Sequence, residues 1–294
     1  MKHLTTITLS LLLSFAIIGC SRGATESESL KIVWQSSGEA LSVPESVVYD
    51  EEKRCFYVSN VNSQSSGNPW SNNSGFISVL NQDGSVKVLH WIEGLKAPKG
   101  LTLDGSILYV ADLNQVVKID TIKGKIIERF QAPKGVDRLN DIVYDAKRHL
   151  LYLSNSSTKE IYQVDDKGVF LRRYAKESDS KAEQNGLYID NDNLIMQGSV
   201  GYLKALSLDS DNQLKSISNQ IHIPIDGITK YKEKGYLVSA WGGEIHFIDK
   251  NGKERLLLDS KPNRSADIFY VQSLDLLLVP DFDKHVIAYK IKNI

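Results

Sequence analysis

The chain has 294 residues, of which 35 are basic and 36 are acidic, so its formal net charge at pH 7 is −1. Charges of both signs are spread along the sequence, without the basic stripe of a nucleic-acid-binding surface or the charge block of a disordered tail. We therefore expect a folded protein that has no nucleic-acid partner.

Residues 1–19 have the pattern of an export signal. A weakly basic start precedes a nearly unbroken apolar run from Leu4 to Ile18. The run is too short to span a bilayer comfortably and has the length of a signal-peptide core. We therefore expect residues 1–19 to be removed from the mature protein.

The apolar run ends in Gly19-Cys20, which resembles the bacterial lipobox, whose cysteine is acylated and becomes the mature N-terminus. The alternative is an ordinary signal peptide in which Cys20 is incidental. Several acyl chains on Cys20 would anchor the protein stably to a membrane, at the periplasmic or extracellular face of the cell envelope. Residues 20–30 then form a polar tether.

Residues 31–294 contain one short block six times, in which an apolar run is followed by a second strand that ends in a small or polar residue. The second strands are Phe56–Asn60, Leu108–Asp112, Leu151–Asn155, Leu194–Gly198, Tyr236–Ala240 and Leu277–Asp281. The copies follow one another at steps of about 41 to 52 residues, and strand patterning at such a period is typical of propeller blades. The sequence therefore predicts an all-β fold, a six-bladed β-propeller.

Two further segments with strand character lie at the two ends of this region. Leu30–Trp34 precedes the first copy and His285–Lys290 follows the second strand of the last copy. Pairing of the N-terminal strand into the last blade would close the propeller and leave no long open edge. Since a closed propeller buries its own core, we expect a monomer.

The step from the first copy to the second is longer because of an insertion. Residues 62–75 are rich in Ser, Asn and Gly and carry Trp70. We expect a surface loop between strands of the first blade, over one mouth of the central channel.

One column stands out when the starts of the six copies are aligned. It contains Glu45, Lys99, Asn140, Asn185, Asp226 and Ala266. The innermost strands of a propeller surround its axis, so these six residues, here called the axial ring, should encircle the channel. Buried polar groups must find partners or bind something.

The chemistry of the axial ring suits a hard divalent cation. Glu45 and Asp226 supply carboxylates, and Asn140 and Asn185 supply amide oxygens. Oxygen donors favour Ca²⁺, with Mg²⁺ and Mn²⁺ as alternatives; Zn²⁺ is a further candidate, although the column has no His or Cys for a structural zinc site. The other interpretation is a ring of mutually satisfied hydrogen bonds.

The chain after the tether resembles the senescence-marker-protein/gluconolactonase/luciferin-regenerating-enzyme family of six-bladed propellers. The resemblance rests on four short motifs in order, namely Pro44-Glu45-Ser46, Arg138-Leu139-Asn140-Asp141, Asn185-Gly186-Leu187 and Asp226-Gly227. It implies that Glu45, Asn185 and Asp226 ligate a catalytic metal and that Asn140 binds metal or substrate. It also implies that Arg138 contacts an oxygen-rich substrate and that Asp226 handles protons.

The resemblance implies metal-assisted hydrolysis of a small lactone or ester, with the cation polarising the carbonyl and a carboxylate activating water. Lys99 departs from this pattern. Its ammonium could repel a cation, replace the metal by pairing with Glu45 or Asp226, or extend to the channel mouth and contact substrate. A non-catalytic surface propeller that binds a ligand or protein partner is therefore the alternative function, and a metal that serves stability alone is a third.

Overall fold

The computed structural model describes residues 27–62, 73–175, 184–198, 202–209, 213–219, 224–261 and 264–294. Residues 1–19, Cys20 and most of the expected loop at residues 62–75 lie outside these ranges, so their predicted roles stay predictions. None of the described segments forms a helix that is long and apolar enough to cross a membrane.

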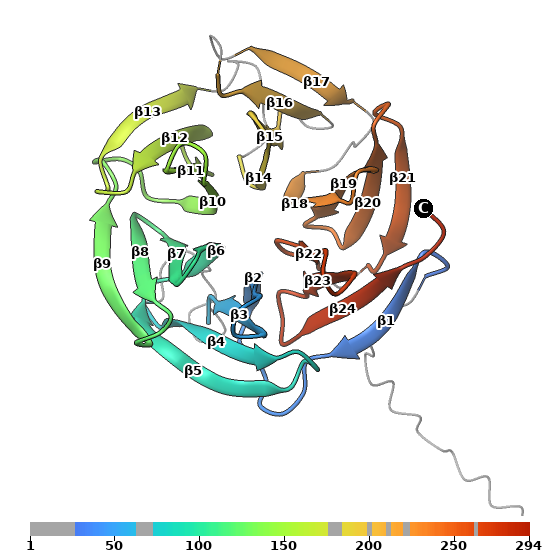
Figure 1. The fold of residues 1–294 in the computed structure, drawn as a ribbon, viewed down its shortest axis with the longest axis horizontal. Coiled ribbons are helices and arrows are strands. Elements are labelled where there is room, and N and C mark those ends of the chain that lie inside the picture. Colours follow the sequence, from blue (N-terminus) through green and yellow to red (C-terminus); the bar gives the residue numbers. More distant parts are fainter. Residues whose placement is uncertain are drawn as a thin grey trace, which may run out of the picture.

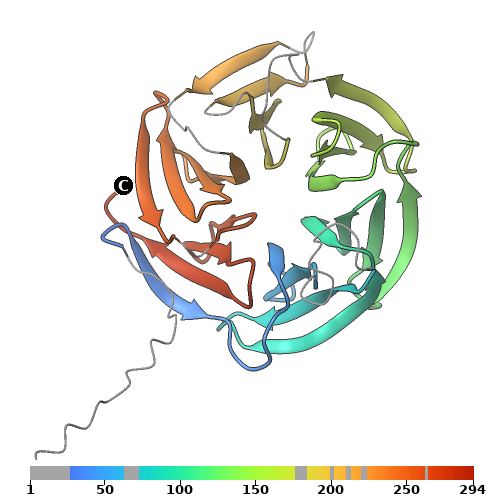
Figure 2. The same ribbon diagram turned by 180° about the vertical axis from the view of Figure 1, so that it is seen from behind.

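The described chain forms six four-stranded antiparallel sheets arranged as blades around a central axis (Figures 1 and 2). The all-β, six-bladed propeller predicted from the repeat is therefore confirmed. The first three blades are β2 (Pro44–Asp50), β3 (Cys55–Asn60), β4 (Gly75–Asn81) and β5 (Val86–Leu95); β6 (Pro98–Asp104), β7 (Ile107–Asp112), β8 (Gln115–Asp120) and β9 (Lys125–Gln131); and β10 (Leu139–Asp145), β11 (Leu150–Asn155), β12 (Glu160–Asp165) and β13 (Phe170–Ala175). The other three are β14 (Leu187–Asp190), β15 (Asn193–Gln197), β16 (Leu203–Ser207) and β17 (Leu214–Ser218); β18 (Ile225–Tyr231), β19 (Gly235–Ala240), β20 (Glu244–Asp249) and β21 (Glu254–Asp259); and β22 (Phe269–Val271), β23 (Leu276–Pro280), β24 (Val286–Ile291) and β1 (Leu30–Gln35).

The sixth blade closes the ring with strands from both ends of the described chain. Its order is β1-β24-β23-β22, and β1 pairs antiparallel with β24 from Leu30, opposite Ile291, to Gln35, opposite Ile287. Leu30 is fully buried, and Ser27 already donates a hydrogen bond of 2.6 Å to the carbonyl of Leu257 in blade 5. The closure expected from the two end segments is therefore present.

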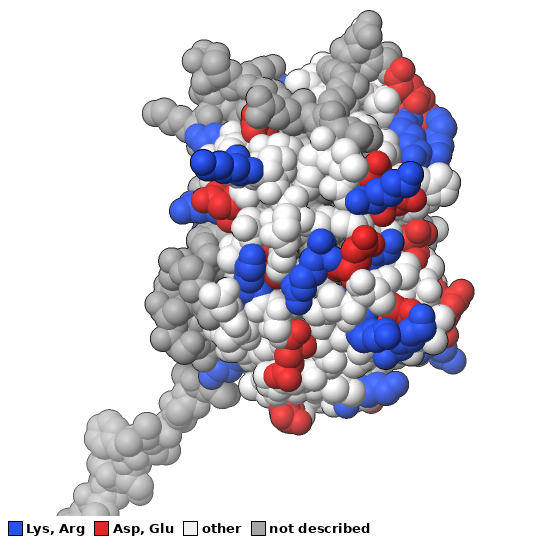
Figure 3. Space-filling model, turned by 90° about the vertical axis from the view of Figure 1, so that its left-hand side faces the viewer, with Lys and Arg blue, Asp and Glu red and all other residues white. Residues whose placement is uncertain are grey.

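Apolar side chains fill the spaces between neighbouring blades, so the hydrophobic core consists of layers between the sheets. Blades 1 and 2, for example, share a cluster that includes Val48, Tyr57, Leu101 and Val110. Alternation along each strand sends successive side chains to the two faces of its blade, and both faces are covered by a neighbour. Figure 3 shows that acidic and basic side chains are interspersed on the outer surface that it displays.

The inner strands are irregular at their start, where the axial-ring residues lie. In β2 the pairing with β3 jumps from Pro44 to Val47, and the same jump occurs in β6, β10 and β18. Two residues in each of these blades are thereby taken out of the regular ladder, as in a β-bulge, which re-aims side chains. The first of the two belongs to the axial ring.

Candidate functional site

The axial ring is buried at one end of the channel. Glu45, Lys99, Asn140 and Asp226 are each at most 4% exposed, Asn185 is partly buried, and Ala266 is fully buried. The six side chains come from six different blades, so the fold collects residues that are 40 to 54 positions apart in sequence.

Lys99 lies inside the channel, where its ammonium pairs with a carboxylate of the neighbouring blade. The distance from Lys99 Nζ to Glu45 Oε1 is 3.5 Å, and both side chains are buried. Nζ also lies 5.4 Å from the centre of the Phe282 ring. Of the arrangements considered for Lys99, the structure contains the pairing with Glu45, because the ammonium does not extend out to the mouth.

The asparagines of the axial ring make hydrogen bonds to neighbouring groups. Asn185 donates to Asp226 Oδ1 over 2.6 Å. Asn140 donates to Ser156 Oγ over 2.9 Å, and this hydroxyl in turn donates to the carbonyl of Gln184 in the next blade. The polar ring is therefore continuous from blade 3 to blade 5.

Three acceptor atoms of the axial ring have no hydrogen-bond partner among the described residues. They are Glu45 Oε2, Asn140 Oδ1 and Asp226 Oδ2, and each is inaccessible to solvent. A buried acceptor without a partner costs about 1–3 kcal/mol, and more when it carries charge. The described side chains of the ring therefore do not satisfy these three oxygens by themselves.

Burial also raises the pKa values of the two ring carboxyls. The pKa of Glu45 lies above its usual value because desolvation outweighs the attraction and hydrogen bond of Lys99. The pKa of Asp226 is raised well above its usual value by desolvation and by the negative charge of Glu45. Each carboxyl is thus held toward its protonated form unless further positive charge enters the channel.

A second ring of residues lies directly next to the first and was not identified in the sequence as functional. It consists of the residues that follow the axial ring in the chain, namely Ser46, Gly100, Asp141, Gly186, Gly227 and Asp267. We call it the adjacent ring. Its carboxyls, Asp141 and Asp267, come from blades 3 and 6, which lie on opposite sides of the axis (Figure 1).

The carboxyl groups of the adjacent ring link neighbouring blades. Asp141 Oδ2 accepts a hydrogen bond of 2.6 Å from the backbone N–H of Leu187, and Asp267 Oδ2 accepts one of 2.7 Å from Ser46 Oγ. Glycines make room for them: a Cβ on Gly100 would lie 2.6 Å from Asp141 Oδ1, and one on Gly227 the same distance from Asp267 Oδ1.

Serines on the second strands complete the irregular inner strands. The N–H groups of Ser46, Asp141 and Gly227 donate to the hydroxyls of Ser59, Ser154 and Ser239, over 2.8 to 3.0 Å. A bulge leaves backbone groups without a ladder partner, and a buried N–H needs another acceptor. The repeated Ser-Asn or Ser-Ala at the end of the second strand was the sequence signal for this support.

The mouth beside the axial ring has an apolar side and a basic rim. Phe282 belongs to a buried cluster at this end, and Trp241 packs edge-on against it at 4.5 Å between ring centres. Arg264 lies 4.8 Å from the Trp241 ring, which is 39% exposed. Arg138, predicted to contact substrate, is exposed just before the Leu139 start of β10, at the same end of the channel.

The donor set of the axial ring fits a hard divalent cation. The described residues contain no group of three or more His, Cys, Asp or Glu side chains that could hold a metal. A cation would therefore depend on Glu45 and Asp226 together with the amide oxygens of Asn140 and Asn185, and three of these residues offer an unpartnered buried oxygen. Oxygen donors of this type are the ligands that Ca²⁺ prefers.

Fold and site together define a six-bladed β-propeller with a polar, partly unsatisfied ring at one end of its axis. No protein-family model and no curated protein matches the sequence. Solved structures do match. One is a streptogramin B lyase, with a TM-score of 0.65 and 14% identity over 90% of this chain and 98% of that chain.

Two other structures show that propellers of this shape serve different purposes. A catalytically inactive virginiamycin B lyase from Staphylococcus aureus with quinupristin has a TM-score of 0.60 and 13% identity, covering 89% of this chain and 99% of that chain. A chain of a nidogen/laminin complex has a TM-score of 0.58 and 17% identity, covering 76% and 82%. At such identities the likeness establishes the fold, and function has to be argued from the site.

Proposed function

We propose that the protein is a divalent-cation-dependent hydrolase of a small lactone or ester, attached to the cell envelope through Cys20. The observation that carries the proposal is the set of three buried, unpartnered oxygens on Glu45, Asn140 and Asp226. Leaving such atoms unpaired is costly, so a ligand that satisfies all three is favoured. The enzymatic neighbours are compatible with this function, and Ca²⁺ is the cation that the donors favour.

Glu45, Asn140, Asn185 and Asp226 would hold the cation, which would polarise the substrate carbonyl and stabilise its developing negative charge. Asp226 would take a proton from the attacking water through Oδ2, the oxygen that has no partner among the described residues. Water adds to the carbonyl carbon, the bond to the ring or ester oxygen breaks, and that oxygen receives the proton.

Two basic residues would act on other parts of the substrate. Lys99, paired with Glu45, keeps a positive charge next to the reaction centre. Arg138, at the exposed rim, has fixed donors for hydroxyl or carboxylate oxygens of a sugar-like substrate. The apolar side of the mouth, at Phe282 and Trp241, would exclude water from one face of the ligand.

The test is the initial rate of hydrolysis of a panel of sugar and acyl lactones by the soluble form that starts at Ser21. It is measured with Ca²⁺, Mg²⁺, Mn²⁺ or Zn²⁺ and with a chelator. We expect a metal-dependent rate, and Asp226→Asn should lower kcat/KM by about 100-fold or more, since a general base contributes a factor of that order.

Asp166→Asn is the matched control, because Asp166 is an exposed aspartate in a hairpin turn far from the axis. It should leave the rate unchanged. A rate that survives chelation, or that Asp226→Asn does not alter, contradicts the proposal.

The second candidate is a non-catalytic propeller that binds a ligand. The observation that favours it is the buried ion pair of Lys99 and Glu45, which places a positive charge where an enzyme of this type would keep its metal. Trp241 with Arg264 above it offers an exposed aromatic and basic surface at the same mouth. Binding of a sugar-acid anion without turnover, lost in Trp241→Ala and measured by calorimetry, would favour this candidate over the hydrolase.

A further inference from the structure

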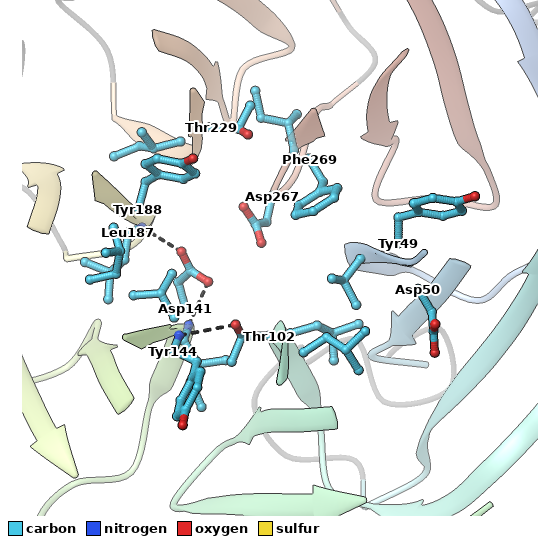
Figure 4. Close-up of a pocket in the computed structure, with 18 of the residues that line it drawn as sticks. Tyr49, Asp50, Thr102, Asp141, Tyr144, Leu187, Tyr188, Thr229, Asp267 and Phe269 are labelled. Atoms are coloured by element: carbon cyan, nitrogen blue, oxygen red, sulfur yellow. Dashed lines mark hydrogen bonds between the residues drawn. The ribbon is translucent and has the colours of Figure 1, made fainter. Parts of the chain in front are cut away.

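The channel has a cavity at the end opposite the axial ring. It has a volume of about 400 Å³ and lies where the inner strands approach their C-terminal ends, from Val48 in blade 1 to Phe269 in blade 6. We call it the far cavity. Figure 4 shows the view into it, with Asp141 and Asp267 projecting toward its centre from opposite walls. The proposed hydrolase makes no use of this space.

The charges that line the far cavity all have one sign. Among the described residues, its wall contains no Lys, Arg or His, and its acidic members are Asp50, Glu51, Glu52, Asp141 and Asp267. Asp50 is already neutralised by Lys53 at 3.0 Å. Asp141 and Asp267, at the inner end of the cavity, have no such cationic partner among the described residues. The far cavity therefore attracts positive charge.

Asp267 keeps an acceptor available for a ligand. Its Oδ2 accepts the hydroxyl of Ser46, and its Oδ1 lies beside Gly227, with lone pairs that a ligand could use. Both oxygens of Asp141 accept backbone N–H groups, from Ile142 and Leu187. Each carboxylate oxygen has two lone pairs, so Asp141 can still accept a further, charge-assisted bond.

The remaining wall of the far cavity is largely apolar. Tyr188 and Phe269 stand beside the two carboxyls (Figure 4), and aliphatic side chains such as Ile142 and Ile228 fill the gaps. The hydroxyl of Thr229 accepts the backbone N–H of Tyr270, so this part of the wall is also satisfied. Such a surface suits the organic body of a ligand better than the water shell of a metal ion.

We propose that the far cavity binds a small organic cation, a primary amine whose ammonium lies between Asp141 and Asp267 and whose apolar body lies against Tyr188 and Phe269. An ammonium has three donors in a compact group, which match carboxylate oxygens that converge from two sides. Aromatic side chains next to the ammonium add attraction through their ring faces.

Titration calorimetry of the soluble form with 2-phenylethylamine tests the proposal, and 2-phenylethanol serves as the uncharged probe of the same shape. We expect the amine to bind and the alcohol to bind at least about tenfold more weakly, the effect of losing one charge-assisted contact. Equal affinity for the two probes, or no binding of the amine, overturns the proposal.

Two variants place the binding in the cavity. Asp267→Asn keeps the side-chain shape and the acceptor for Ser46, and it should weaken amine binding by about tenfold or more. Val143→Phe adds bulk to the wall and should abolish binding. Glu93→Gln, on the outer strand β5 and with a side chain that is 70% exposed, is the matched control and should change affinity less than twofold. Amine binding that Asp267→Asn leaves unchanged contradicts the assignment.

Failure of the far-cavity proposal can be distinguished from failure of the proposed hydrolase. Arg138→Ala, at the other end of the channel, should weaken lactone hydrolysis and leave amine binding unchanged. If no lactone is hydrolysed but the amine binds, the far cavity stands and the hydrolase falls. If hydrolysis is found but the amine does not bind, the opposite holds.

Discussion

The two ends of the central channel are made by the same six inner strands, yet they differ in how their charges are balanced. At the axial-ring end, Glu45 has the ammonium of Lys99 as its partner, and Asn185 supports Asp226. At the far end, Asp141 and Asp267 are held by backbone N–H groups and a hydroxyl, and no cation among the described residues faces them. The difference shows that one repeat, closed into a ring, can present two different charge environments along its axis.

The largest expected loss of stability comes from removing the Lys99 ammonium at the axial-ring end of the channel. Lys99→Met keeps most of the side-chain volume but leaves Glu45 buried without its partner, which should cost about 3–5 kcal/mol at pH 8. The loss should be smaller at pH 5, where the raised pKa of Glu45 allows it to take up a proton. Urea unfolding at both pH values measures this difference.

The double variant Lys99→Met/Glu45→Gln tests the cause of that loss. It should recover much of the stability, because no unpaired charge is left in the channel. A double variant as unstable as Lys99→Met alone would show that the lysine contributes by packing, and the contrast between the two ends would then lose its basis.

A smaller loss should follow when room for the carboxyls of the adjacent ring is removed. Gly227→Ala would bring a Cβ to 2.3 Å from the backbone nitrogen of Ile268, a contact that no side-chain rotation relieves. We expect a loss of about 1–3 kcal/mol, typical of overpacking. Gly105→Ala, in a turn with nothing within 4 Å of the new Cβ, controls for the change of residue type, apart from the strain of its positive φ.

The hydrogen bonds that serines of the second strands accept from the inner strands should contribute less to stability than the glycines do. Ser239→Ala leaves the N–H of Gly227 without its acceptor and should lower the free energy of unfolding by about 1–2 kcal/mol. Ser273→Ala, at an exposed serine, should have no measurable effect. If thermal unfolding gives equal values for both variants, the hydroxyl is not needed at the irregular strand.

A change of pH should test the same carboxyls in the metal-free protein. The carboxyls of Glu45, Asp141, Asp226 and Asp267 have raised pKa values in the folded state, so their contribution to stability is complete below the unfolded pKa near 4 and is lost as pH rises through the folded values. We expect the Tm to fall between pH 5 and pH 8. Ca²⁺ or the amine should reverse part of the fall at pH 8. A Tm that rises over this range contradicts the assignment.

The fold and the axial ring could be predicted from the sequence because both follow from the repeated block. Second strands ending in Asn60, Asp112 and Asn155 recur at a blade-like period, and alignment of the blades places Glu45 and Asp226 in one column. The direction of the Lys99 side chain could not be predicted, since it depends on the distance to Glu45 across a blade boundary.

The adjacent ring and the far cavity were missed for a related reason. The column that follows the axial ring contains three glycines, one serine and only two aspartates, so it shows no shared chemistry in an alignment. The role of this column becomes clear only in the structure, where Gly227 lies against Asp267 and Ser46 donates to the same carboxyl. Gly227 and Asp267 belong to the consecutive blades 5 and 6, whereas Ser46 and Asp267 belong to the first and last blades. An alignment of the blades does not show either contact.

The pairing of β1 with β24 has a consequence for how the molecule is made. The sixth blade cannot be completed until β24 has been synthesised. Leu30, which is fully buried in the folded protein, therefore has no partner strand until then. Contacts between such distant segments slow folding and leave strand edges exposed to other chains in the meantime. The first strand of such a chain therefore keeps an open edge until β24 pairs with it.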